Sequence, residues 1–123
     1  MNNKPHWNLL LSDFVNKNQL IKNGQKTIEL RLYDQKRKQI KIGDEIIFTN
    51  TDTKQELFTK VINLHRFESF EQLYNNLVLL KCGYTPENVD KASADDMEKY
   101  YSKAEQKKYG VIGIELCVQE KGK

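Results

Sequence analysis

The sequence has 123 residues, 38% of them hydrophobic, which suits one small domain and leaves little apolar material for a second core. Lysine and arginine number 20 against 17 aspartate and glutamate residues, and the resulting net charge of +3 excludes a histone-like polybasic protein. The apolar runs at residues 9–11 and 77–80 are far shorter than the roughly 18 residues that span a membrane.

The N-terminus and the cysteines give no sign of export or of metal binding. The first six residues lack the apolar stretch of a secretory signal, so we expect a cytoplasmic protein. Cys82 and Cys117 are far apart in the chain and form no C-x-x-C pair, and only two histidines accompany them. We therefore expect free thiols, no metal site and no cofactor.

Two patterns follow each other at the start of the chain. Apolar residues from Trp7 to Ile21 recur at three-and-four spacing and Gly24 follows them, which predicts a helix over residues 7–23. From Lys26 to Tyr33 the period changes to two, which predicts a strand. Its apolar face carries Ile28, Leu30 and Leu32, and its polar face carries Thr27, Glu29, Arg31 and Tyr33.

A charged loop and two further strands come next. The loop covers residues 34–39, residues 40–44 lead into a strand through residues 46–48, and residues 50–53 mark a turn. Residues 56–67 are rich in β-branched and aromatic side chains, which predicts a third strand.

The second half of the chain predicts two helices and a last strand. Ser69 and Gln72 have the spacing of a capping box, so a helix begins there and ends at Cys82 and Gly83. Ser93 caps the next helix, which has an acidic first turn and a last turn with lysines 107 and 108. Residues 109–117 then predict the final strand.

This order of elements favours an antiparallel or mixed sheet that is curled into a small barrel, in the α+β class. We expect one domain over residues 7–118, a flexible N-terminus at residues 1–6 and a flexible tail at residues 119–123. A monomer is the expected oligomeric state.

Glu29 and Arg31 are the most informative polar residues of the predicted sheet. They lie two positions apart, about 7 Å along one side of a strand, which is close enough for a salt bridge or for one shared ligand. Three arrangements are open from the residues alone: a solvated surface pair, a ligand site, or a buried pair of partners.

The same segment resembles a known family. Gly24, Lys26, Glu29 and Arg31 fit the G-x-K-x-x-E-x-R signature of the ASCH family, which belongs with the PUA-like folds. The resemblance continues through the I-x-x-G-D segment at residues 40–44 and the K-Y-G-V segment at residues 108–111, and it covers nearly the whole chain. The chain looks like the short stand-alone bacterial and archaeal members. The resemblance implies a small mixed β-barrel flanked by helices, with a cleft lined by the signature and a role in RNA binding.

The resemblance suggests chemistry for individual residues. Lys26 and Arg31 can contact a phosphate or a base edge, and Glu29 can accept from an exocyclic amine or a ribose hydroxyl. A base can stack on Tyr33 or Tyr109, although Tyr109 can equally pack in the barrel. The dense basic stretch can track an RNA backbone or be merely solvated; it comprises Lys36, Arg37, Lys38 and Lys41.

A hydrolase is the alternative to a binding protein. Some ASCH-like proteins are amidohydrolases on N4-acetylcytidine and use a threonine nucleophile beside the signature lysine, but Glu29 occupies the matching position here. This departure favours binding of RNA or a nucleotide-like molecule over catalysis. If the protein is an amidohydrolase or a ribonuclease instead, Lys26 and Glu29 are the candidate catalytic residues. His6 and His65 offer little support for catalysis. A protein-interaction domain with an incidental cleft is the third possibility.

Overall fold

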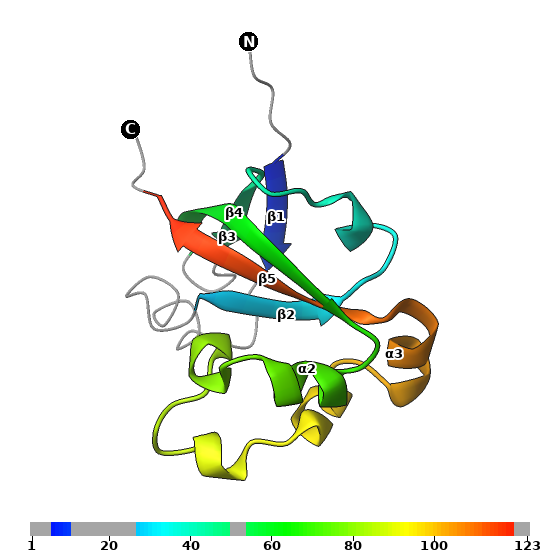
Figure 1. The fold of residues 1–123 in the computed structure, drawn as a ribbon. Coiled ribbons are helices and arrows are strands. Elements are labelled where there is room, and N and C mark those ends of the chain that lie inside the picture. Colours follow the sequence, from blue (N-terminus) through cyan, green and yellow to red (C-terminus); the bar gives the residue numbers. More distant parts are fainter. Residues whose placement is uncertain (1–5, 11–26, 50–53, 120–123) are drawn as a thin grey trace.

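A computed structural model describes residues 6–10, 27–49 and 54–119 (Figure 1). Its sheet has five strands, in the spatial order β1-β3-β4-β5-β2. They are β1 (His6–Leu10), β2 (Ile28–Leu32), β3 (Glu45–Thr49), β4 (Glu56–Phe67) and β5 (Val111–Val118). Four strands pair antiparallel and curl into a half-barrel, while β1 joins β3 in parallel. The predicted mixed sheet of an α+β, PUA-like fold is confirmed.

The predicted helix over residues 7–23 is wrong at its start, because residues 6–10 form β1. Trp7 pairs with Ile46 and Leu10 with Thr49 along the edge of β3. Pairing with an existing strand satisfies the backbone polar groups of so short a segment, and it outweighs the local apolar periodicity. The rest of that helix falls in residues 11–23, which lie outside the described residues, as does the predicted turn at 50–53.

Most helical turns gather on one side of the sheet (Figure 1). They are α2 (Phe70–Asn76), η2 (Leu79–Cys82), η3 (Val89–Lys91), η4 (Ala94–Lys99) and α3 (Lys103–Tyr109). The turn η1 (Arg37–Gln39) lies apart from them in the charged loop at residues 34–39, called the basic loop below. The prediction that a helix begins at Ser69 is confirmed, because the Ser69 hydroxyl accepts a hydrogen bond from the Gln72 backbone N–H. None of the helices in the described ranges is long and apolar enough to cross a membrane.

Both predicted helices of the second half are shorter than expected. The first predicted helix corresponds to α2, which ends at Asn76. The separate turn η2 follows it and is capped by Gly83, whose φ of 107° favours glycine. The second is divided into η4 and α3, because Ser102 provides a second capping box with Glu105. The residues between them, Tyr100 and Tyr101, pack against the core. The cap at Ser102 and the packing of the two tyrosines therefore divide a segment for which the sequence pattern predicted one continuous helix.

The strand β5 separates two apolar layers. Ile112, Ile114 and Leu116 face the inside of the half-barrel with side chains of β3 and β4. Val111 faces the helices, together with the apolar side chains of β2. The alternation predicted for β2 is thus confirmed, since Ile28, Leu30 and Leu32 all lie in the helical layer. The limits of the domain and the flexibility of its ends stay predictions; β1 begins at His6 and β5 ends at Val118.

Gln106 links the two α-helices inside the helical layer. Its side chain is buried, its Oε1 accepts from the Phe70 backbone N–H at 3.2 Å, and its Nε2 donates to the Tyr101 carbonyl at 3.2 Å. The first N–H groups of a helix have no partner within the helix, so Gln106 satisfies one of them at the start of α2. This contact fixes Phe70 and Tyr101 relative to each other.

Two tyrosines join α2 to η4. The hydroxyls of Tyr74 and Tyr84 are 2.7 Å apart, and Tyr84 donates to Asp96 at 2.6 Å. Burial raises the pKa of Tyr74 to about 12, and burial together with the Asp96 carboxylate raises the pKa of Tyr84. Both groups therefore hold their protons more tightly in the folded chain than in the unfolded one.

We expect the stability of the protein to fall as the pH rises from 10 to about 12, because an unfolded tyrosine loses its proton near pH 10 and Tyr74 near pH 12. Below pH 10 both states keep the proton and this contribution is fully present. Urea unfolding at pH 9, 10.5 and 12 measures the decline, and Tyr74→Phe should make it shallower. The same decline in Tyr74→Phe would contradict the assignment.

Candidate functional site

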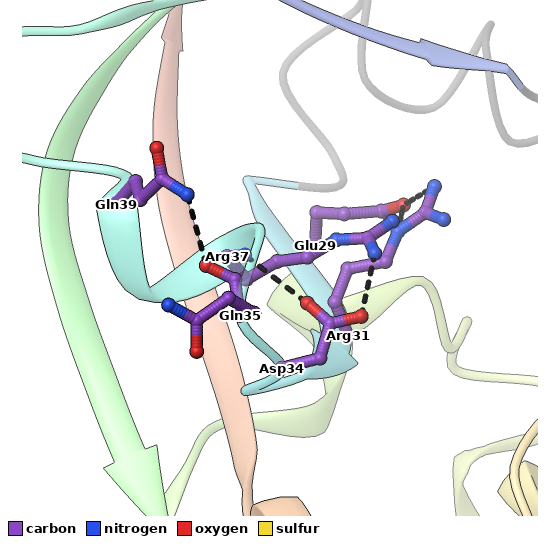
Figure 2. Close-up of polar contacts among 6 residues, drawn as sticks. All are labelled: Glu29, Arg31, Asp34, Gln35, Arg37 and Gln39. Carbon is purple, nitrogen blue, oxygen red and sulfur yellow. Dashed lines mark hydrogen bonds and ion pairs between the residues drawn. The ribbon is translucent and has the colours of Figure 1, made fainter.

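Glu29 and Arg31 form a buried ion pair on β2 (Figure 2). Arg31 Nε donates to Glu29 Oε2 at 2.9 Å, and Arg31 Nη2 lies 2.7 Å from the same oxygen. The Glu29 side chain is only 6% exposed and that of Arg31 is 17% exposed. The structure therefore excludes the solvated surface pair and leaves a buried pair that reaches the surface through Arg31.

Tyr101 adds a hydroxyl to this pair. Burial lowers the pKa of the Arg31 guanidinium, but the Glu29 carboxylate and the Tyr101 hydroxyl outweigh it and leave that pKa above its ordinary value. The Tyr101 ring stacks on Phe70 with centroids 5.9 Å apart. Sequence reasoning gave Tyr101 no role in the site, although Tyr100 and Tyr101 are neighbouring aromatic residues in the segment between two helical turns.

A second cation lies on the same face of the sheet as Arg31. Arg31 is opposite Ile112 on β5, and Ile112 is opposite Arg66 on β4. Residues that are directly opposite each other in antiparallel strands share one face, so the three side chains form a row. Arg66 could not be found from the sequence, because the register of β4 against β5 is a tertiary property.

Tyr33 follows Arg31 on the polar side of β2, and two cations lie near its ring. Arg66 Nη1 donates to the Tyr33 hydroxyl at 3.1 Å, and the Arg66 guanidinium carbon is 5.4 Å from the ring centroid. Lys38 Nζ is 5.7 Å from the same centroid. The Tyr33 ring also packs against the inner layer of the half-barrel. Cations within about 6 Å of an aromatic ring are attracted to it, so Tyr33 gathers positive charge.

The basic loop divides into structural and exposed cations. Arg37 donates to Asp34 through its backbone N–H at 3.1 Å and through Nη1 at 2.9 Å, so it holds the η1 turn together (Figure 2). Lys36, Lys38 and Lys41 are exposed. The Lys41 backbone N–H donates to the buried Asp44 carboxylate, within the predicted I-x-x-G-D turn.

The structure does not bring the remaining predicted residues into this row. Tyr109 packs in the helical layer, under the Lys108 ammonium at 5.2 Å, and so lies on the other side of the sheet from Tyr33. His65 pairs with Glu115 at 2.8 Å. It is opposite Gly113, where an added Cβ would meet side chains of the helical layer, and thus faces away from Arg31. Gly24 and Lys26 lie outside the described residues.

A separate polar groove of about 770 Å³ lies on the helical side, between α2, η4 and α3. Its walls hold more carboxylates than ammonium groups: Glu68, Glu71, Asp95 and Glu98 against Lys103 and Lys107. An excess of negative charge repels phosphate, so this groove does not suit RNA. Within the described ranges no three potential metal ligands cluster, and neither Cys82 nor Cys117 forms a disulfide.

A model of the ASCH domain matches residues 18–119. The chain is similar to the crystal structure of hypothetical protein PH0355, at 32% identity and a TM-score of 0.76, with 94% of this chain and 100% of that chain covered. It is also similar to the solution structure of protein PF0455 from Pyrococcus furiosus, at 29% identity and a TM-score of 0.67, with 94% and 99% covered. No curated protein matches it significantly.

Proposed function

The chain belongs to the ASCH domain family, which is generally linked to RNA binding, and from this premise we propose that it binds RNA or a nucleotide-like molecule on the face of β2 that carries Glu29 and Arg31. The observation that carries the proposal is the buried ion pair. Such a pair contributes little stability compared with well-packed apolar residues, and charged groups with perturbed surroundings gather at functional sites.

The geometry of the pair suits a ligand with both hydrogen-bond donors and negative charge. The guanidinium of Arg31 is a planar fork that can meet a phosphate or the edge of a base. Glu29 holds this fork through Nε and Nη2, which fixes its direction before a ligand arrives. Lys26 belongs to the same proposal as a phosphate contact. We further propose a monomer that acts in the cytoplasm as one domain over residues 7–118.

The hydrolase alternative receives less support from the pair. Two donor groups of Arg31 point at Oε2 of Glu29, so this oxygen is already occupied by hydrogen bonds. A general base or a nucleophile needs the opposite condition. Incubation with N4-acetylcytidine and with short RNAs tests this alternative directly, and product formation that is lost in Glu29→Gln would establish catalysis.

We expect a screen of the four ribonucleosides, their monophosphates and short single-stranded RNAs to yield a ligand that raises the melting temperature. Arg31→Lys should weaken its binding by roughly 1 to 3 kcal/mol, because the charge beside Glu29 is kept while the fork is lost. Binding of single-stranded RNA should weaken with salt at a log-log slope of about −2, as for about three phosphate contacts. Unchanged affinity in a well-folded Arg31→Lys protein would contradict the proposal.

A further inference from the structure

Arg66 and Arg31 are separated by a single strand. Both are paired with Ile112, one from each side, so their backbones lie roughly 10 Å apart at the usual strand spacing of about 4.8 Å. The Arg66 side chain is exposed, whereas Arg31 is mostly buried and paired. The two guanidinium groups therefore stand in different surroundings on one face, one already neutralised by a carboxylate and one open to solvent.

Among the residues that the structure describes, no carboxylate pairs with Arg66. The ion pairs formed among the described residues join Arg31 with Glu29, Arg37 with Asp34 and His65 with Glu115, and none of them involves Arg66 or Lys38. Instead Arg66 and Lys38 meet at the Tyr33 ring, although one comes from β4 and the other from the η1 turn. Two positive charges at one aromatic ring raise the local positive potential, which attracts an anion such as a phosphate group.

We propose that Arg66, assisted by Lys38, binds a phosphate group of the ligand, so that the site takes a nucleotide or single-stranded RNA in preference to a bare nucleoside. This inference rests on the proposed function and deepens it. Arg31 then meets the base or sugar part of the ligand, and Arg66 meets a phosphate across Ile112. The family signature contains neither Arg66 nor Lys38.

The same geometry assigns Tyr33 a different role from base stacking. Its hydroxyl accepts from Arg66 Nη1 at 3.1 Å, and its ring lies against two cations and the inner apolar layer. A ring in these contacts has less surface to offer a base. Tyr33 is therefore a positioning residue that holds the guanidinium of Arg66 toward the phosphate, in the way that supporting hydrogen bonds orient a binding group.

The experiment compares ligands that differ only in phosphate. Affinities of the wild-type protein are measured by titration for the four ribonucleosides, their 5′- and 3′-monophosphates and a short oligouridylate. We expect at least one phosphorylated probe to bind about tenfold more tightly than its nucleoside. Arg66→Gln should remove most of this preference and leave nucleoside affinity unchanged, and it should reduce the salt slope for the oligonucleotide by about 0.7. Tyr33→Phe, which keeps the ring, should lose part of the preference.

Lys60→Gln is the matched control. Lys60 is an exposed cation on the same strand, but its neighbours Thr59 and Val61 point into the core, so it faces away from the row. The Lys60→Gln protein should bind nucleosides and phosphorylated probes as tightly as the wild-type protein. A full phosphate preference in Arg66→Gln, or equal binding of nucleosides and nucleotides by the wild-type protein, would overturn the inference while the proposed function stands. No binding of any probe by the wild-type protein would overturn both.

Discussion

Replacing Arg31 with methionine should lower the free energy of unfolding by about 3 kcal/mol, the lower end of the range for breaking a buried pair. Methionine keeps much of the side-chain volume, so the loss measures charge more than packing. The Glu29 carboxylate, which is 6% exposed, would lose the guanidinium that compensates it. Urea unfolding at neutral pH measures the change.

Arg37 provides a matched control for this substitution. Its side chain is 18% exposed, close to the 17% of Arg31, but its partner Asp34 is 28% exposed and can be rehydrated. Arg37→Met should therefore cost less than about 1 kcal/mol. The double variant Glu29→Gln/Arg31→Met should recover part of the loss, because no buried charge is left behind. Equal losses in Arg31→Met and Arg37→Met would refute the role of burial.

Phe70→Ala should lower the free energy of unfolding by about 3 to 5 kcal/mol, the usual range for deleting a buried aromatic ring. Phe70 is fully buried at the first position of α2, and it stacks on Tyr101. Its loss should leave a cavity beside Tyr101, whose hydroxyl supports Arg31. Denaturant unfolding measures the loss, and Phe70→Leu keeps the fold measurable if the alanine variant is too unstable.

Ligand binding separates this effect from a purely global one. Phe70→Leu should weaken binding of the ligand found for the wild-type protein, because Tyr101 loses its stacking partner and holds Arg31 less firmly. Leu57→Ala is a suitable comparison, since Leu57 is buried in the inner layer on β4 and away from Tyr101. If both variants bind as tightly as the wild-type protein, the support of Arg31 by Tyr101 and Phe70 does not exist.

Elements with strong local signals were predicted well from the sequence. The strand β4 has the predicted bounds, and α2 begins at the predicted cap, Ser69. In β2 the alternation of apolar and polar side chains identified the face that carries Glu29 and Arg31. These features depend on neighbours in the chain, on side-chain type and on backbone hydrogen bonds within one turn.

Features that depend on distant partners were missed. The apolar periodicity predicts the start of a helix where β1 lies, because only the pairing with β3 makes residues 6–10 a strand. The burial of Glu29 and the row from Arg31 to Arg66 both follow from the register of β5 with its neighbours. A strand pattern shows which residues share a face of their own strand, but it does not tell which residues of other strands stand beside them.

The pairing of β2 with β5 also determines when the binding face can form during synthesis. β2 is synthesised well before β5, the strand that it pairs with in the sheet. Arg31 and Arg66 cannot be aligned until β5 has been made and inserted between their strands. Closing so long a loop costs conformational entropy, and contacts distant in sequence form slowly. A nascent chain that stops before β5 would therefore contain both Arg31 and Arg66, but it would lack the binding surface that they form when β5 lies between their strands.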